Sequence, residues 1–587
     1  MRIAVINRDR CQPRKCAREC EYFCPPVRTG DETITFVDGK PAITENLCVG
    51  CGICVRKCPF GAITIINLPD ELENPTHRYG KNGFALYGLP VPAAGKVTGL
   101  LGANGIGKST AVAILSGLLA PNLGRGASWK EVIESTAGSA LGDYLRRVVE
   151  RGVKTAYKPQ YVDRIPKSYS GTVRGLLDKT DERGALPALV ERLNLAPLMD
   201  REISSLSGGE LQRVAIVACA ARDADVYFFD EISPYLDIYQ RINAARAIGE
   251  LAETKAVMVV EHDLALLDLL AENVHVVYGT PGAYGVITRP KGVRVGINQY
   301  IKGYLPEENI RIRSEPIVFE VHAPRAEKDV PLLAEYQPFT RSYARFVLEA
   351  ERGEIRKGEV VGILGANGIG KTTYIKILAG VEEPTTGKVD LKLKVSYKPQ
   401  YLKAEGDLSV QGFLRKVTPE FDSSIYQSEF VKPMGLEKLL DQSMDELSGG
   451  ELQRVAIVGC LSREADLYLL DEPSAHLDVE QRMMAAKVMR RYAESAERSV
   501  LVVDHDIYLI DLLSEKLMVF EGEQGKRGVA HPPVEMREGM NRFLKGIGIT
   551  FRRDEDTRRP RVNKPNSRLD RSQRESGEYY YYAADAA

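Results

Sequence analysis

Two short segments combine glycines with a lysine and a hydroxyl residue at a spacing that binds phosphate. GANGIGKST at 102–110 and GANGIGKTT at 365–373 both match G-x-x-x-x-G-K-[ST], between an apolar strand-like run and an apolar helix-like run. The backbone N–H groups can surround phosphate oxygens, the lysine can reach the β- and γ-phosphates, and the next hydroxyl can bind Mg²⁺. The predicted residues are Gly102, Asn104, Gly105, Gly107, Lys108, Ser109 and Thr110, and then Gly365, Asn367, Gly368, Gly370, Lys371, Thr372 and Thr373.

An acidic pair ends an apolar run after each of these loops. Asp230 and Glu231 follow VYFF, and Asp471 and Glu472 follow LYLL. An aspartate at such a strand end holds the Mg²⁺ shell of a bound nucleotide. The following glutamate can orient the attacking water or accept its proton. The alternative is an acidic pair that caps the next segment, and its presence beside a phosphate loop in both halves argues against that.

Eight of the ten cysteines lie before residue 60. Cys48-x2-Cys51-x2-Cys54-x3-Cys58-Pro59 has the spacing of a 4Fe–4S run, in which the fourth cysteine binds the other cluster. A second set, formed by Cys11, Cys16, Cys20 and Cys24, has four, three and three residues between successive cysteines and ends in another Cys-Pro pair. This predicts one cluster on Cys11, Cys16, Cys20 and Cys58, and another on Cys48, Cys51, Cys54 and Cys24. Two zinc sites are the alternative. The clusters could transfer electrons or serve as rigid staples, and the staple is favoured because no flavin motif accompanies them.

The chemical motifs occur twice, so the chain carries an internal repeat. YKPQY at 157–161 returns at 397–401, and LSGGELQRVAIV at 206–217 returns at 447–458. The first copy has 23 extra residues between its first two motifs. That excess has apolar residues at helical spacing on both sides of a Thr-Ala-Gly-Ser break, which predicts a helix–loop–helix at about 122–152.

Overall composition limits the classes of function. The 587 residues carry 79 Lys and Arg against 80 Asp and Glu, so nucleic acid could be bound only through local patches. Residues 1–30 hold seven basic and three acidic residues, and 551–575 hold nine and five, a net charge of +4 in each. Such patches suit RNA phosphates, although bound thiolates and a solvated tail would explain them too. No apolar run is long enough for a membrane span, and we expect no signal peptide.

Strand-like and helix-like runs alternate in each repeat, which predicts an α/β fold with a parallel sheet. The expected domains are a ferredoxin-like iron–sulfur domain at 1–75, a first nucleotide-binding domain at 76–292, an ordered hinge at 293–313, a second nucleotide-binding domain at 314–538, a second hinge at 539–561, and a basic, then disordered tail at 562–587.

The segments SLSGGELQR and ELSGGELQR resemble the signature motif of ATP-binding-cassette (ABC) ATPases, with Glu210 and Glu451 where many members have glutamine. The resemblance implies two tandem cassettes in head-to-tail arrangement, with each ATP held between one phosphate loop and the opposite signature. It assigns Ser448, Gly449 and Gly450 to the first site, and Ser207, Gly208 and Gly209 to the second.

The same resemblance assigns further residues. Gln160 and Gln400 match the glutamine that binds Mg²⁺ and water, and His262 and His505 match the switch histidine at the γ-phosphate. Asp237 and Asp478 match a loop that crosses the seam between cassettes. Tyr87, with Phe346 as its rough counterpart, could stack on adenine or simply belong to the core. Cys219 and Cys460 are expected to be buried structural thiols.

The whole arrangement resembles ABC subfamily E, the ribosome-recycling ATPases also called RNase L inhibitors. This implies a Mg²⁺-dependent, monomeric ATPase of the archaeal or eukaryotic cytoplasm that splits ribosomes after termination or stalling. Its partners would be the small ribosomal subunit, through ribosomal RNA and protein, and Pelota or a class-one release factor. Three alternatives remain: a transport ATPase with a separate membrane protein, an ATP-gated iron–sulfur electron-transfer protein, and a DNA-repair clamp, which normally carries long coiled coils.

Overall fold

The structure is a computed structural model that describes residues 2–7, 10–37, 39–67, 74–150, 152–313, 315–319, 330–400 and 408–580. The chain divides into two compact units. Unit 1 contains Met1–Ile232, Ala244–His262 and Leu270–Glu315, and unit 2 contains Ser233–Asn243, Asp263–Leu269 and Pro316–Ala587. Two short segments of the first repeat therefore belong to the same unit as the second repeat.

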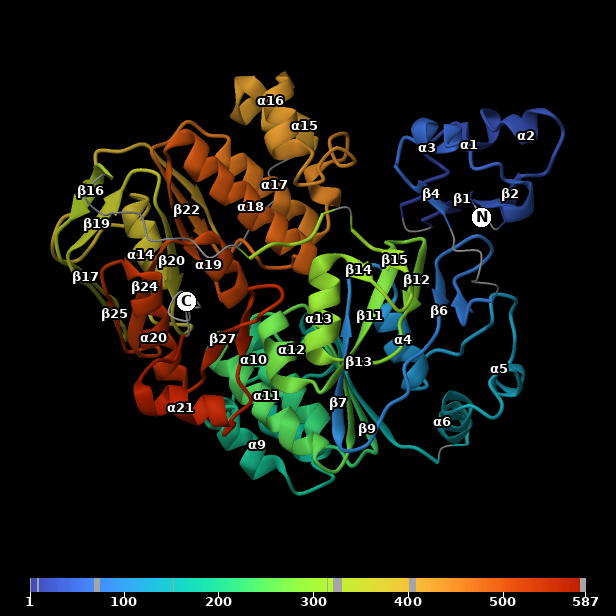
Figure 1. Cartoon of the computed structure of the whole chain (residues 1–587), viewed down its shortest axis with the longest axis horizontal. Helices are drawn as coiled ribbons and strands as arrows, with labels where there is room; N and C mark the ends of the chain where they lie inside the picture. The colour runs from blue at the N-terminus through green and yellow to red at the C-terminus, as the bar shows by residue number, and fades with distance from the viewer. Residues whose placement is uncertain are drawn as a thin grey trace. The chain divides into compact units, whose positions relative to one another are not determined.

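The N-terminal part of unit 1 holds the clustered cysteines on short elements. Strands β1 (Arg2–Ile6) and β4 (Ile63–Asn67) pair antiparallel, as do β2 (Ile34–Val37) and β3 (Lys40–Ile43). Helices α1 (Glu19–Tyr22), α2 (Pro25–Arg28) and α3 (Ile53–Lys57) complete this lobe (Figure 1). Its small core is built from Ala4, Ile6, Ile34, Ile43 and Ile63 together with three of the cysteines, so the thiols take part in the packing.

The first cassette of unit 1 is built on parallel strands. β9 (Val226–Asp230) pairs in parallel with β8 (Thr155–Lys158) and with β10 (Ala256–Val260), and β7 (Lys96–Leu101) pairs in parallel with β11 (Asn273–Thr280). Strand β11 also pairs with β12 (Tyr284–Ile287) and β13 (Lys291–Gly292), and β6 (Ala85–Tyr87) pairs with β12 and with β5 (His77–Arg78). The phosphate loop and the acidic pair follow β7 and β9, at the carboxyl ends where parallel sheets bind ligands.

The helices of the first repeat and its connector are α4 (Lys108–Leu115), α7 (Ile165–Ser168), α8 (Val173–Thr180), α9 (Leu186–Arg192), α10 (Gly208–Ala220), α11 (Ile238–Ala252), α12 (Leu264–Leu270) and α13 (Val293–Lys302). The start of α11 and most of α12 belong to unit 2. The hairpin β14 (Tyr304–Leu305) and β15 (Ile310–Arg311) follows α13. Helix α13 ends in the left-handed Gly303, whose conformation suits a residue without a Cβ. The connector is therefore ordered structure rather than a flexible linker.

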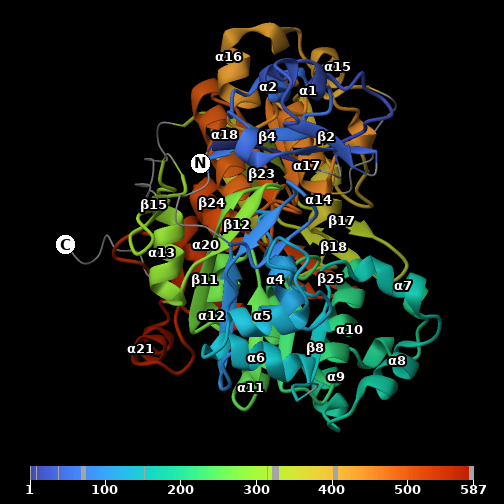
Figure 2. The ribbon, with the colours of Figure 1, turned by 90° about the vertical axis from the view of Figure 1, so that its right-hand side faces the viewer.

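Two further helices fill the stretch that the first repeat has in excess. α5 (Trp129–Ser135) begins with a capping box in which Ser128 and Glu131 satisfy each other's backbone N–H groups. α6 (Ala140–Val149) packs against it (Figure 2). Tyr144 is buried and its hydroxyl donates to the carbonyl of Leu115 at 2.7 Å, which attaches the pair to the end of α4.

The second cassette repeats the same plan in unit 2. Its main sheet runs β17 (Phe339–Ser342), β18 (Val347–Ala350), β25 (Arg527–Ala530), β24 (Lys516–Glu523), β20 (Val360–Leu364), β23 (Ser499–Val503), β22 (Leu467–Asp471) and β21 (Val395–Lys398), with β26 (Val534–Glu535) beside β24. β16 (Leu332–Tyr336) pairs with β19 (Gly353–Arg356). The helices are α14 (Lys371–Leu378), α15 (Val410–Val417), α16 (Ser424–Tyr426), α17 (Gly449–Leu461), α18 (Val479–Ala496), α19 (Ile507–Leu513) and α20 (Met536–Ile547).

For the C-terminal extension we expected a basic, then disordered tail at 562–587, and the structure shows that its basic part is folded. Strands β27 (Phe551–Arg553) and β28 (Pro560–Val562) form an antiparallel hairpin, and α21 (Arg568–Ser576) follows. Tyr580 is buried, and its hydroxyl accepts a hydrogen bond from Arg553 at 2.6 Å. Local contacts within the extension and with α19 order it. Residues 581–587 lie outside the described part of the chain.

The search for membrane-spanning helices covered the described residues, and none there combines the length and apolar character that a bilayer crossing needs.

Candidate functional site

The two phosphate loops have the same local geometry. Gly107 and Gly370 adopt left-handed conformations, with φ of 93° and 96°, immediately before α4 and α14. A Cβ on Gly107 would lie 2.6 Å from the ring of Phe84, so only glycine fits there. The ammonium of Lys108 donates to the carbonyls of Gly102 at 2.9 Å and Ala103 at 2.7 Å.

Lys371 repeats this arrangement in the second loop. Its ammonium donates to the carbonyls of Gly365 at 2.9 Å and Ala366 at 2.6 Å. Each lysine thus lies folded over a loop whose glycines leave room for the close approach of a phosphate. The chemistry of both loops fits the phosphates of a nucleoside triphosphate.

The aspartate of each acidic pair interacts with the hydroxyl that follows the phosphate-loop lysine. Burial raises the pKa of Asp230, although the Ser109 hydroxyl and Lys158 oppose the rise. Burial raises the pKa of Asp471 to about 6, against the lowering effect of the Thr372 hydroxyl. Carboxylate and hydroxyl oxygens are donors that Mg²⁺ prefers. A divalent cation would also stabilise the ionised form of these buried carboxylates, so both donor sets fit one.

Glu231 faces the other residues predicted to take part in hydrolysis. The Gln160 amide donates to its Oε1 at 2.6 Å, and Nε2 of His262 lies 3.7 Å from the same atom. Burial raises the pKa of Glu231 to about 7, and the carboxylates of Asp230 and Glu261 add to the rise. A carboxyl group with this pKa can exchange a proton near neutral pH.

Glu472 holds the corresponding position with a different electrostatic environment. Nε2 of His505 lies 3.5 Å from its Oε1. Burial alone would raise the pKa of Glu472, but hydrogen bonds with His505 and Gln400 lower it to about 2. The two glutamates therefore occupy equivalent places with opposite shifts of pKa.

The signature segments form helix N-termini. Ser207 begins α10, and its hydroxyl accepts from the N–H of Glu210 at 3.4 Å while Glu210 accepts from the N–H of Ser207 at 2.7 Å. Ser448 and Glu451 form the same capping box at α17. The glutamate that replaces the usual glutamine thus has a structural role at the helix start. Gly208, Gly209, Gly449 and Gly450 lie in the first turns of these helices.

Asp237 belongs to unit 2 and contacts the second phosphate loop there. The N–H of Asn367 donates to its Oδ2 at 2.7 Å. The structure therefore brings Asp237 to the loop of the other repeat, as the ABC resemblance implies. Asp478 caps the start of α18 by accepting from the N–H of Gln481 at 2.9 Å.

The aromatic residue before the first phosphate loop needs a correction. Tyr87 is buried within β6, between β5 and β12, so its ring is not available to stack on a base. Phe84 is the true counterpart of Phe346: the rings of Phe84 and Phe346 lie against Gly107 and Gly370 at the same place in each repeat. A stricter register of the repeat would have identified Phe84.

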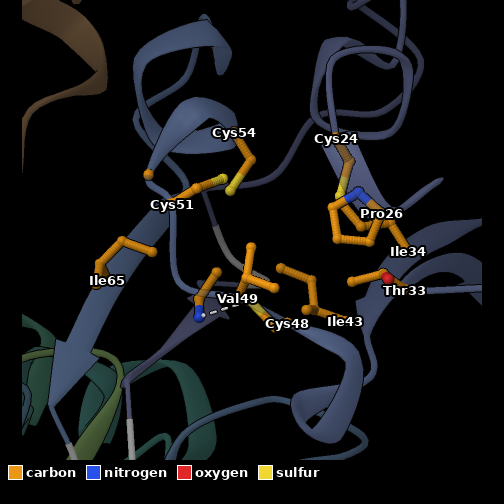
Figure 3. A pocket seen from close by; sticks show the side chains of 12 residues that line it. Cys24, Pro26, Thr33, Ile34, Ile43, Cys48, Val49, Cys51, Cys54 and Ile65 are labelled. Atoms are coloured by element: carbon orange, nitrogen blue, oxygen red, sulfur yellow. Dashed lines mark hydrogen bonds between the residues drawn. The ribbon is translucent and has the colours of Figure 1, made fainter. Parts of the chain in front are cut away.

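The clustered thiols form two groups. Burial raises the pKa of Cys20 to about 11, and Cys58, Cys11 and Cys16 add to the rise. Burial likewise raises the pKa of Cys54 to about 12, with contributions from Cys48, Cys51 and Cys24. The structure thus brings together the two sets that the spacing predicts. Cys24, Cys48, Cys51 and Cys54 line a single pocket with Ile34 and Ile43 (Figure 3).

Both thiol groups fit iron–sulfur clusters, because each set supplies four thiolates, one for each iron atom of a 4Fe–4S cluster. Backbone N–H groups also point at the sulfurs, from Ala4 to Cys48 and from Ala62 to Cys58, each at 3.4 Å. Such donors stabilise cluster thiolates.

The remaining cysteines are buried structural thiols. Cys219 and Cys460 lie inside α10 and α17, and burial raises the pKa of Cys219 to about 12 and that of Cys460 to about 11. Two other buried residues were missed from the sequence, Lys158 and Lys398, which contact the main chain of the acidic pairs. The signal that could have identified them is the repeated YKPQY segment.

Comparisons with known proteins agree with this geometry. A family model described as ABC transporter matches residues 92–233 and 348–475. Residues 1–32 match a possible Fer4-like domain in RNase L inhibitor, and residues 41–64 match a 4Fe–4S binding domain. An uncharacterized ABC transporter ATP-binding protein of Methanocaldococcus jannaschii is 53% identical, over 99% of this chain and 98% of that protein.

Relatives with more informative names are also similar over their full length. Translation initiation factor RLI1 of Saccharomyces cerevisiae is 44% identical over 99% of this chain and 98% of its own. A structure described as a model of ribosome-bound archaeal Pelota and ABCE1 matches with a TM-score of 0.92 and 53% identity, covering 99% of both chains. A complex of archaeal ribosomal stalk protein aP1 and the recycling factor aABCE1 matches with a TM-score of 0.85 and 54% identity, covering 88% of this chain and 100% of that one.

Proposed function

Because the chain belongs to the E family of ABC proteins, which includes the RNase L inhibitors, we propose that it is an ATP-driven factor that splits ribosomes into subunits. The observation that carries the proposal is similarity over the whole chain, with a TM-score of 0.92, to an archaeal ABCE1 described as ribosome-bound with Pelota. The cysteine lobe matters here, because a transport ATPase has no need of it. We expect the protein to act in the cytoplasm as a monomer.

The chemistry of the proposed reaction is Mg²⁺-dependent hydrolysis of ATP. Bound Mg²⁺ would neutralise charge on the β- and γ-phosphates. Lys108 and Lys371 would bind the phosphates, and Asp230 and Asp471 with the neighbouring hydroxyls would hold the cation. Each catalytic glutamate orients the attacking water and accepts its proton, and the histidine beside its carboxylate would contact the γ-phosphate.

Binding and hydrolysis would change how the cassettes associate. Each signature serine begins a helix whose free N–H groups can donate to a γ-phosphate, which ADP lacks. ATP therefore favours the closed pair and hydrolysis releases it. The cysteine lobe, stiffened by two 4Fe–4S clusters, would move as the cassettes close. Its partners would be the small ribosomal subunit and Pelota or a class-one release factor.

A sucrose gradient of cell lysate tests the proposal. With a non-hydrolysable ATP analogue, the chain should sediment with small ribosomal subunits, and with ADP it should remain near the top. A variant with Lys108→Met and Lys371→Met serves as the control, because it lacks the phosphate-binding cations and should not sediment with either nucleotide. Absence of the wild-type chain from small-subunit fractions in the presence of the analogue would disprove ribosome recycling.

A further inference from the structure

A buried lysine contacts the main chain at the catalytic glutamate of the first repeat. Lys158 is the last residue of β8 and is 1% exposed. Its ammonium donates to the carbonyl of Asp230 at 2.9 Å and to the carbonyl of Glu231 at 2.5 Å. A fully buried ammonium has three donors to satisfy, and here two of them are given to consecutive carbonyls of the acidic pair.

The backbone at Glu231 requires such support. Its φ is +53°, in the left-handed region that side chains other than glycine rarely adopt. Strained conformations of this kind persist only where surrounding contacts hold them, and they cluster at active sites. The N–H of Glu231 donates to the carbonyl of Val260 at 2.9 Å, so both polar groups of its peptide units are held.

The second repeat has the same device. Lys398 ends β21, is 1% exposed, and donates to the carbonyl of Asp471 at 2.8 Å and to that of Pro399 at 3.2 Å. Glu472 has φ of +46°, and its N–H donates to Val503 at 2.8 Å. Lysine is almost never fully buried unless it is paired, yet a buried lysine lies beside a left-handed glutamate at the equivalent position of each repeat.

A glutamine from each signature helix adds a second donor. The amide of Gln212 on α10 donates to the carbonyls of Glu231 at 2.7 Å and Ile232 at 2.8 Å. The amide of Gln453 on α17 donates to the carbonyl of Glu472 at 2.7 Å. The peptide that follows each catalytic glutamate therefore receives donors from a separate element of its own cassette.

The lysine and the predicted Mg²⁺-binding glutamine also share one segment. Lys158 precedes Gln160 by two residues, and the Gln160 amide donates to the carboxylate of Glu231. The segment after β8 thus holds Glu231 at both ends, by its side chain and by its main chain. We propose that Lys158 and Lys398 are positioning residues for ATP hydrolysis, which fix the left-handed peptide so that the glutamate carboxylate remains directed at the attacking water.

This inference rests on the proposed role of Glu231 and Glu472 in hydrolysis. It assigns no contact between either lysine and the nucleotide, so loss of the ammonium should slow the chemical step without weakening ATP binding. Displacement of a catalytic group by a fraction of an ångström to 1 Å costs up to about 100-fold in rate.

The test replaces both lysines by methionine, which keeps the length of the side chain and removes its donors. In the full-length protein, Lys158→Met with Lys398→Met should lower kcat for ATP by about 10- to 100-fold, while KM and the Kd for a fluorescent ATP analogue change by less than about twofold. Arginine at both positions restores a buried cation with donors and should recover part of kcat. Lys154→Met is the matched control. Lys154 immediately precedes β8 and its side chain is 68% exposed, so this substitution should leave kcat unchanged.

Each outcome decides the matter. Unchanged kcat in the methionine variant, or equal losses of kcat and ATP affinity with no recovery by arginine, would overturn the inference in favour of a purely structural lysine. Glu231→Gln with Glu472→Gln is measured in parallel. If that pair turns over normally, the assignment of the base fails and the inference with it; if that pair is inactive while the methionine variant is normal, only the lysine inference fails.

Discussion

The guanidinium of Arg559 binds the carboxylate of Asp268, 291 residues earlier in the chain, at 2.5 and 3.4 Å. Both residues lie in unit 2, and both side chains are completely buried. Asp268 lies on α12, six residues after His262, and Asp511 holds the equivalent place on α19, six residues after His505. Asp511 is bound by Arg553 of the same hairpin, at 2.7 Å through both terminal nitrogens. One C-terminal hairpin therefore fixes both helices that follow the predicted switch histidines.

We predict that Arg559→Met destabilises unit 2 strongly. The substitution leaves the Asp268 carboxylate buried without its main partner, which typically costs about 3–5 kcal/mol. Denaturant unfolding, followed by a probe in unit 2, should show the midpoint shifted to lower denaturant. Arg571 lies on the exposed face of α21, so Arg571→Met is the control and should have the same denaturant midpoint as the wild type. Equal midpoints for both variants would show that the buried pair contributes nothing to stability.

A second prediction concerns the catalytic glutamates. Glu231→Gln with Glu472→Gln removes the proton acceptor but keeps the shape and the hydrogen bonds of the side chain. We expect normal ATP binding, a loss of about 100-fold or more in turnover, and accumulation of the chain on small ribosomal subunits with ATP. Turnover is measured by phosphate release and binding by a fluorescent ATP analogue. A double variant that hydrolyses ATP at the normal rate would show that the glutamates are not the base.

The opposite pKa shifts of these glutamates predict different pH profiles. In Glu472→Gln the working base is Glu231, whose pKa is raised to about 7 by burial and neighbouring carboxylates. A carboxyl group is protonated below its pKa and cannot then accept a proton, so kcat should fall as pH drops below about 7. In Glu231→Gln the working base is Glu472, whose pKa of about 2 keeps it ionised at every pH in the assay.

The measurement is kcat at saturating ATP between pH 5.5 and 8.5 for both single variants, a range chosen to bracket the pKa of about 7 expected for Glu231. The unfolding midpoint of each variant at each pH serves as the control, because unfolding at low pH would imitate the effect. Parallel profiles for the two variants would contradict the difference in electrostatic environment.

A residue of the site could be predicted from the sequence where one short segment contained the whole of its signal. The phosphate loops, with Lys108 and Lys371, are recognisable because one short segment contains the glycines, the lysine and the flanking strand and helix. For Lys158 and Lys398 the repeated YKPQY segment marks the positions but not their burial, because a lysine in a strand usually faces solvent and only the fold buries these ammonium groups against the acidic pairs.

The structure of the C-terminal extension could not be predicted either, because its contacts join residues that are distant in the sequence. Its excess of basic over acidic residues predicted contact with RNA or, as the alternative, a solvated tail. The partners of Arg553 and Arg559 are Asp511 and Asp268, which are distant in sequence and meet these arginines only after folding. Tertiary ion pairs of this kind cannot be read from composition or periodicity.

The cysteine lobe gives a final prediction, which concerns the exchange of fourth ligands between the two clusters. Cys24 is the last cysteine of the first set in the sequence. In the structure, however, its thiol lies near those of Cys48 and Cys51, which belong to the second set. Cys24→Ser should therefore remove the same cluster as Cys54→Ser, and Cys58→Ser should remove the other. Each variant purified without oxygen should hold about four iron atoms per chain instead of about eight, with half the absorbance near 400 nm.

The pairing of variants distinguishes this arrangement from the simple one. If the ligands are exchanged, Cys24→Ser combined with Cys54→Ser still retains about four iron atoms, because both changes affect one cluster, whereas Cys24→Ser combined with Cys58→Ser retains almost none. With unexchanged sets, Cys24→Ser combined with Cys54→Ser would instead retain almost no iron, because Cys24 would then share its cluster with Cys20 and not with Cys54. Cys24→Ser combined with Cys58→Ser loses both clusters in either arrangement, so it serves as the reference for complete loss. Cys219→Ser, a buried thiol inside α10, is the control and should keep the full iron content. Zinc in place of iron in the wild type would refute the cluster assignment altogether.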